Sequence, residues 1–204
     1  MSLEEPNPQD ETWKKVGLFG GSFDPVTLAH LYVIHQVHDL LDLDEVWLIP
    51  TSQNPIKLER TPAPPEWRLT MLEVAVSDLP YVQVSRLELD RKGPSYTVNT
   101  VRELLQRHPR HNFILIMGTD TYSSLPKWKE AEQLVKLIRF AVVDRPGDLF
   151  KALPGHESVI HLQIDPTDLS STKVRDAIEN GEPFAHLVPA GVADLIMREN
   201  LYHP

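Results

Sequence analysis

Residues 17–31, GLFGGSFDPVTLAHL, combine the features of an anion-binding turn. A short apolar run ends at Gly20 and Gly21, and a Ser-Phe-Asp-Pro turn then leads into a helix-like stretch that carries His30. Glycines let a ligand approach the backbone closely, and the free N–H groups at the start of a helix attract anions. The alternative is a tight turn without a ligand, because the stretch matches neither GxGxxG nor GxxxxGK[ST].

A second stretch, LSSTKVR at residues 169–175, has the composition of a phosphate-binding helix start. We expect Ser171 to cap this helix, Thr172 to lie in its first turn and Arg175 to follow on the same face. Hydroxyls, helix N–H groups and one guanidinium would then converge on an anion. The alternative is simple capping beside a solvated arginine.

An alternation of strands and helices must position these two stretches. The apolar patterns predict strands at residues 16–20, 45–50, 82–89, 113–117, 140–143 and 159–163. They predict helices at residues 28–41, 66–77, 95–107, 130–137, 171–180 and 192–200, with Ser95 as the cap of the third. The first helix should bury a face made of Val33, Val37, Leu40 and Leu41.

This order favours an α/β fold, a Rossmann-like parallel sheet with helices on both faces. Ligands of such sheets bind outside the carboxyl ends of the strands, where the candidate motifs lie. We expect residues 1–13 to be a flexible leader, 14–164 a Rossmann-like domain and 165–204 a small C-terminal helical subdomain carrying the SSTxxR motif.

Composition narrows the function further. The chain has 204 residues, no cysteine and a net charge of −9. Disulfides, thiolate metal sites and cysteine nucleophiles are therefore excluded, and nucleic acid or an anionic membrane is a poor partner. The N-terminal stretch lacks a secretory signal pattern, and no apolar run is long enough to span a membrane, so we expect a cytoplasmic protein.

The opening stretch is part of a longer resemblance. GGSFDPVTLAH resembles the nucleotidylyltransferase signature, in which G-G-[ST]-F-D-P is followed by [HT]-x-G-H. Five further stretches fall in the order and spacing of bacterial nicotinate-nucleotide adenylyltransferases, namely KGPSYTVNTV (92–101), MGTDTYSSLPKW (117–128), DRPG (144–147), LSSTKVR (169–175) and LVPAGVADLIMRENLY (187–202). The resemblance implies adenylyl transfer from ATP, with Mg²⁺, to nicotinate mononucleotide in NAD biosynthesis, with release of pyrophosphate.

The resemblance also implies roles for residues on the ATP side. The attacking phosphate is already an anion, so catalysis requires alignment and charge neutralisation rather than a general base. His30, Thr27 and Arg175 would be catalytic, with His30 donating to the α-phosphate and the Thr27 hydroxyl contacting phosphate in place of a histidine. ATP would be bound by Gly20, Gly21, Ser22, Phe23, His30, Ser171, Thr172 and Arg175. Ala29 replaces the usual glycine of the motif.

The nicotinate side would be formed by Thr97, Asp120, Trp128, Lys129 and Lys57. Thr97 would take the pyridine carboxylate at a helix start, Trp128 would stack on the ring beside the Lys129 N–H, and Asp120 would accept from ribose hydroxyls. Lys57 lies in NPIK, where the family has PPHK, within a proline-rich loop at residues 51–65. The alternatives are a core tryptophan, a loop-capping aspartate and a solvated lysine.

Three other functions stay open. The same chemistry could act on nicotinamide mononucleotide or phosphopantetheine, the chain could be a class I aminoacyl-tRNA synthetase-like domain, or it could be a catalytically weak nucleotide-binding protein. We expect no resident metal site, because His35 and His38 lack a third ligand, and no nucleic-acid or membrane partner. The sequence leaves the oligomeric state open, a homo-oligomer included.

Overall fold

The computed structural model describes residues 12–52, 62–91, 93–144, 150–156, 159–164 and 169–203. The strands are β1 (Lys15–Gly21), β2 (Glu45–Pro50), β3 (Val82–Val84), β4 (Asn112–Gly118), β5 (Arg139–Val143) and β6 (Ile160–Leu162). The α-helices are α1 (Leu28–Leu41), α2 (Pro65–Ala75), α3 (Thr97–Arg107), α4 (Thr119–Ser123), α5 (Ala131–Leu137), α6 (Ser171–Glu179) and α7 (Ala190–Arg198). Two short 3₁₀ helices are η1 (Leu125–Lys127) and η2 (Ala185–Leu187).

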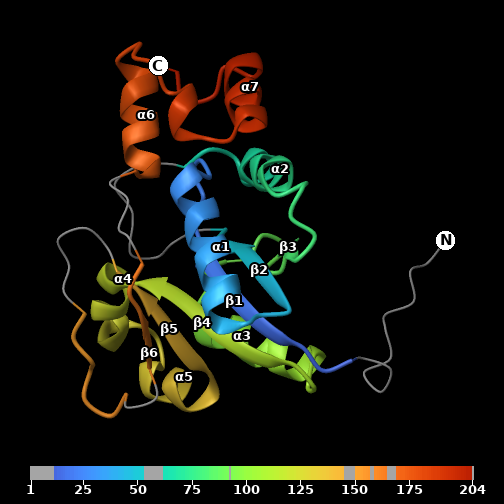
Figure 1. The fold of residues 1–204 in the computed structure, drawn as a ribbon, viewed down its shortest axis with the longest axis vertical. Helices are drawn as coiled ribbons and strands as arrows, with labels where there is room; N and C mark the ends of the chain where they lie inside the picture. The colour runs from blue at the N-terminus through green and yellow to red at the C-terminus, as the bar shows by residue number, and fades with distance from the viewer. Residues whose placement is uncertain are drawn as a thin grey trace.

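The strands form one six-stranded sheet in the order β3-β2-β1-β4-β5-β6 (Figure 1). Every neighbouring pair is parallel, and Leu18 of β1 lies between Trp47 of β2 and Leu115 of β4. The predicted α/β fold with a parallel sheet is therefore confirmed. The order reverses between β1 and β4, which is the position where open parallel sheets of this kind bind ligands.

Alternating strand residues supply two apolar cores, one on each face of the sheet. In β4, Ile114 and Ile116 pack with α1, α2, α6 and α7, whereas Phe113, Leu115 and Met117 pack with α3 and α5. Both faces are thus covered by helices, which is why these strands are apolar throughout. No described helix is both long enough and apolar enough to cross a bilayer.

Several predicted bounds were wrong, and the side-chain contacts give the reasons. β3 ends at Val84, and the residues after it turn away, so the strand predicted to residue 89 is only three residues long. Ser95 does not cap α3, because Tyr96 is the N-cap and the buried Ser95 hydroxyl donates to the Glu88 carbonyl over 3.5 Å.

On α1 the buried residues are Ala29, Ile34, Val37 and Leu41.

Leu40 was placed on the wrong face of α1. Its side chain is 55% exposed, while Val37 is fully buried. The helix buries positions spaced by three and four residues from Ile34, and Leu40 falls between them.

Helices α6 and α7 lie together at one end of the molecule, beside α2 (Figure 1). The contact between α7 and α2 is close, since a Cβ atom on Gly191 would lie only 2.6 Å from Val74 Cγ1. Helices α6 and α7 both contribute to the apolar core that contains residues of α1 and α2. The boundary at residue 165 and the leader at residues 1–13 stay predictions, and residues 1–11 lie outside the described part of the chain.

Candidate active site

The loop after β1 occupies the point where the strand order reverses. β1 ends at Gly21 and its neighbour β4 ends at Gly118, so residues 22–27 and the start of α4 follow the carboxyl ends of adjacent strands. α1 begins at Leu28, directly after this loop. The structure therefore places the first predicted motif where the fold binds ligands.

The two glycines of the loop serve different purposes. Gly20 is exposed, and a Cβ atom there would meet only the Ile49 carbonyl at 3.9 Å. At Gly21 a Cβ atom would lie 3.1 Å from the ring of Phe23. A side chain at Gly21 would therefore crowd the Phe23 ring, whereas at Gly20 the space that a side chain would fill is open to a ligand.

Phe23 has an unusual backbone for a non-glycine residue, with a φ of 46°. Its ring is buried and lies 5.7 Å from that of Phe19 and 5.2 Å from that of His30, edge to face in both cases. Packing therefore maintains a backbone conformation that alone is unfavourable, as is common at ligand-binding loops. The ring of Phe23 is one wall against which His30 is positioned.

His30 is held by the residue that caps its helix. Thr27 is the N-cap of α1, and its backbone N–H donates to His30 Nδ1 over 3.0 Å. The Thr27 hydroxyl lies 2.8 Å from the same ring nitrogen and is fully buried. A backbone N–H can only donate, so Nδ1 is an acceptor, and a neutral imidazole then carries its proton on Nε2.

The second motif docks onto this loop. Ser171, the first residue of α6, donates its hydroxyl to the Pro25 carbonyl over 2.8 Å. Arg175 donates through Nη1 to the Asp24 carbonyl over 2.6 Å and through Nη2 to Thr172 Oγ1 over 3.2 Å. Segments about 150 residues apart in the sequence are therefore joined at one place, as the predicted convergence requires.

The predicted cap of α6 was wrong by one residue. Ser170 is the N-cap, and its hydroxyl accepts from the Lys173 N–H over 3.3 Å. Adjacent serines give the same local signal in the sequence, and only their contacts in the structure distinguish them. Ser171 therefore attaches α6 to the loop rather than capping it.

Arg68 of α2 was not predicted from the sequence, yet it supports the same loop. Its side chain is 1% exposed and donates to the carbonyls of Ser22 (2.7 Å), Ala63 (3.0 Å) and Ser52 (3.5 Å). Burial lowers the pKa of this guanidinium, although the nearby Asp24 opposes the effect. An arginine on an amphipathic helix usually indicates a solvated face, so the sequence carried no signal for it.

Three of the residues predicted for the nicotinate side, Thr97, Trp128 and Lys129, lie near the start of α3. Thr97 is the first residue of that helix, and the Lys129 ammonium lies 4.4 Å from the centre of the Tyr96 ring. Trp128 is partly buried, and its indole N–H donates to Ser124 Oγ over 3.1 Å. The Tyr96–Lys129 contact thus brings Thr97, Trp128 and Lys129 into one region, and no role for Tyr96 was predicted from the sequence.

Asp120 is exposed in α4, directly after β4. Lys57 and most of DRPG (145–147) lie outside the described residues, so the geometry says nothing of them. His35 and His38 both lie against Asp39 on α1, at 3.6 and 2.8 Å. Among the residues that the structure describes, no group of three or more acidic or histidine side chains could hold a metal ion.

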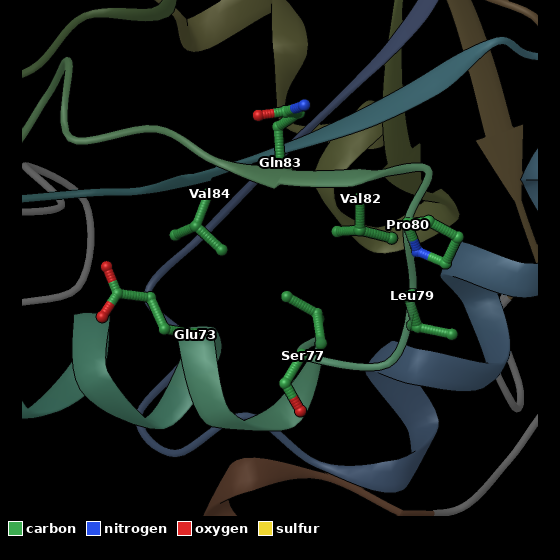
Figure 2. Close-up of a pocket in the computed structure, with 8 residues that line it drawn as sticks. Glu73, Ser77, Leu79, Pro80, Val82, Gln83 and Val84 are labelled. Carbon is green, nitrogen blue, oxygen red and sulfur yellow. The ribbon is translucent and has the colours of Figure 1, made fainter.

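An open hollow of about 400 Å³ lies between α2 and β3, lined by Glu73, Ser77, Leu79, Pro80, Val82 and Val84 among others (Figure 2). β3 is the edge strand, and β2 separates it from β1. This hollow is therefore distinct from the candidate site.

Comparison with known proteins identifies the family. The cytidylyltransferase-like family model matches residues 18–177. A probable nicotinate-nucleotide adenylyltransferase of Dehalococcoides mccartyi is 40% identical over 197 residues, covering 92% of this chain and 97% of the relative. The chain belongs to the nicotinate-nucleotide adenylyltransferases of the cytidylyltransferase-like family. A second probable nicotinate-nucleotide adenylyltransferase, from Geobacillus kaustophilus, is 37% identical over 188 residues, covering 92% of this chain and 86% of the relative.

Solved structures of this family share the fold. The nicotinic acid mononucleotide adenylyltransferase of Plasmodium falciparum, complexed with NaAD, superposes with a TM-score of 0.78 at 20% identity, covering 93% of this chain and 97% of that one. A putative nicotinate-nucleotide adenylyltransferase of Vibrio parahaemolyticus gives 0.68 at 22% identity, covering 93% and 95%. The predicted resemblance, the Rossmann-like fold and the assignment to the nucleotidyltransferases are thereby confirmed.

Proposed function

We propose that this protein transfers the adenylyl group of ATP to nicotinate mononucleotide, as nicotinate-nucleotide adenylyltransferases do in NAD biosynthesis. The observation that carries the proposal is the docking of α6, through Ser171 and Arg175, onto the loop that leads to His30. Histidine, arginine and two helix N-termini then face one anionic substrate. Family membership supplies the identity of that substrate.

In the proposed reaction, a phosphate oxygen of nicotinate mononucleotide attacks the α-phosphorus of ATP. A new P–O bond forms as the bond to the β-phosphate bridging oxygen breaks, and pyrophosphate leaves with that electron pair. The nucleophile is already ionised, so no residue needs to remove a proton. The protein contributes alignment and neutralisation of the charge that develops on the phosphoryl oxygens.

His30 supplies part of that neutralisation. Because Nδ1 accepts from the Thr27 N–H, the ring would donate its Nε2 proton to an α-phosphate oxygen. Thr27 is fully buried, so we assign its hydroxyl to orienting His30 rather than to direct phosphate contact. Gly20 would let the nucleotide approach the backbone, with Gly21, Ser22 and Phe23 shaping the loop.

Arg175, Thr172 and the first turn of α6 would neutralise the phosphates that leave as pyrophosphate. Mg²⁺ would arrive bound to ATP as part of the substrate, held by phosphate oxygens and water. A cysteine-free chain acting on ATP and pyridine nucleotides fits the cytoplasm.

On the acceptor side, the start of α3 offers a site for a carboxylate. Thr97 and the free N–H groups of that first turn would bind the pyridine carboxylate, and the partial positive charge of the helix end favours an acid over an amide. Trp128 would stack on the ring beside the Lys129 N–H, and the exposed Asp120 would accept from ribose hydroxyls.

The test uses ATP that carries ³²P at the α-phosphate and measures which product receives the label. We expect the label to appear in nicotinic acid adenine dinucleotide when nicotinate mononucleotide is the acceptor. Phosphopantetheine and nicotinamide mononucleotide serve as competing acceptors in parallel reactions. Label transfer to phosphopantetheine alone would reassign the acceptor, and ATP binding without transfer to any acceptor would leave a nucleotide-binding protein.

A further inference from the structure

A tyrosine that follows the last helix reaches the loop after β1. The Tyr202 hydroxyl donates to Asp24 Oδ1 over 2.9 Å, although the two residues are 178 positions apart. Burial, together with the Asp24 carboxylate, raises the pKa of Tyr202 well above its ordinary value. The phenol therefore keeps its proton at any physiological pH and remains a hydrogen-bond donor to the carboxylate.

Asp24 connects four segments of the chain. Its side chain is nearly buried, and Oδ1 also accepts from the Ala63 N–H over 3.0 Å, just before α2. Its backbone carbonyl accepts from Arg175 of α6 over 2.6 Å, and its Oδ2 lies 3.8 Å from the same guanidinium nitrogen. The loop, the segment before α2, helix α6 and the segment after α7 therefore meet at a single residue.

A buried carboxylate is stabilised by each of its hydrogen-bond donors. Without the Tyr202 hydroxyl, Asp24 Oδ1 would keep only the Ala63 N–H, and the carboxylate would either shift toward another donor or admit water. Arg175 Nη1 lies 3.8 Å from Oδ2 and also donates to the Asp24 carbonyl, so a shift of Asp24 would move both the loop and the arginine. Pro25 follows Asp24 directly, and Thr27, three residues after Asp24, binds His30, so the disturbance would reach the histidine.

We propose that Tyr202 is a positioning residue for adenylyl transfer, whose hydroxyl fixes Asp24 and thereby sets Arg175 and the loop that leads to His30. The inference rests on the proposed function for its catalytic consequence, whereas its structural consequence stands without it. Tyr202 makes no contact with the reacting atoms in this account.

The test compares Tyr202→Phe with Tyr81→Phe. Both variants remove one phenol hydroxyl and keep the ring, but the Tyr81 hydroxyl pairs with the exposed His35 over 3.2 Å, away from the loop. Hydrogen exchange of the amides of residues 20–30 and the rates of pyrophosphate release are measured on both variants. Exchange reports the loop independently of turnover.

For Tyr202→Phe we expect faster exchange in residues 20–30, with β4 unchanged, and kcat lowered about tenfold while the KM for ATP changes less than about threefold. Tyr81→Phe should match the wild type in both measurements. A purely structural tyrosine would lower the melting temperature but leave kcat per folded molecule unchanged, and that result would overturn the proposal. Unchanged loop exchange would overturn it as well.

A double-variant experiment tests the route through Arg175. If Tyr202 acts through the arginine, Tyr202→Phe should lower kcat by a smaller factor in the Arg175→Lys protein than in the wild type. Equal factors in the two backgrounds would contradict that route. A wild-type protein that released no pyrophosphate would refute the proposed function, and the exchange data would still decide whether Tyr202 holds the loop.

Discussion

The backbone N–H of Thr27 donates to Nδ1 of His30 over 3.0 Å, and this one bond sets which ring nitrogen of the histidine carries the proton. The Thr27 hydroxyl lies 2.8 Å from the same nitrogen. Because both groups belong to the residue that caps α1, the orientation of the ring is tied to the start of the helix. The ring is thereby held in one orientation before any substrate binds, as the proposed neutralisation of phosphate charge requires.

Replacing His30 by alanine should remove that donor. We expect His30→Ala to lower kcat by about 10²–10³, the typical cost of losing one donor to a charge that develops in the transition state. Affinity for ATP should change little, because the contact strengthens mainly in the transition state. His186→Ala, at an exposed histidine of η2, is the matched control. Unchanged turnover of the alanine variant in steady-state assays would remove His30 from the mechanism.

Thr27→Val tests the orienting role of the hydroxyl. The valine keeps the size of the side chain and the backbone N–H, so Nδ1 retains one of its two contacts. We expect kcat to fall about tenfold, less than for His30→Ala, and stability to fall by about 1 kcal/mol, as for other lost helix caps. Thr27→Ser keeps the hydroxyl and should retain most of the activity. A serine variant as impaired as the valine variant would show that the hydroxyl is not the relevant group.

The sequence predicted the parts of the site that depend on local spacing. Thr27 and His30 lie at the start of one helix, so their proximity follows from helical geometry alone. Asp24, Arg68 and Tyr202 were missed because their contacts join segments from 39 to 178 residues apart, and nothing in a single segment indicates such a contact. The resemblance supplied the convergence of the two motifs, but not the atoms that join them.

Alanine substitutions at the two glycines should separate binding from folding. Gly20→Ala has room for its methyl group, so the fold should be kept while the KM for ATP rises, because the methyl group occupies space open to the ligand. Gly21→Ala would press on the Phe23 ring at 3.1 Å and should destabilise the protein by about 1–3 kcal/mol. Thermal melting and ATP titration of both variants check this. If the two substitutions changed the melting temperature equally and ATP affinity equally, Gly20 and Gly21 would not differ in role as described.

The fold was easier to predict than its edges. Buried parallel strands such as β4 are apolar throughout, and their pattern is unmistakable. The strand predicted at residues 82–89 was too long, because its apolar alternation shifts phase after Ser85, where a bend was expected. The structure ends β3 at Val84, and Leu87 packs against the apolar core from a turn. The prediction that Leu40 is buried was wrong because apolarity alone does not determine which face of a helix is buried.

The buried Glu88 should make stability depend on pH. Burial raises the pKa of this carboxyl, although Thr100, Arg91 and Ser95 oppose the effect, and Oε2 has no hydrogen-bond partner among the described residues. In the window between the ordinary value of 4.5 and the raised pKa, the unfolded chain binds fewer protons than the folded one. Stability must therefore fall as pH rises through this window.

Glu88→Gln removes that titration. Relative to this variant, the wild type should lose stability as the pH rises above 4.5 and should reach a plateau above the raised pKa. Urea unfolding at a series of pH values measures the difference. A constant difference between the two proteins across the series would mean that Glu88 ionises in the folded state as readily as in the unfolded chain.

The most direct test of the account is the initial rate of pyrophosphate release from Mg-ATP, with nicotinate mononucleotide and nicotinamide mononucleotide compared side by side. We predict strong turnover with the acid and little with the amide, because the start of α3 at Thr97 favours a carboxylate. Equal turnover with the amide would keep the chemistry but contradict the carboxylate site. No release with either acceptor, in a protein that binds ATP, would contradict the proposed function itself.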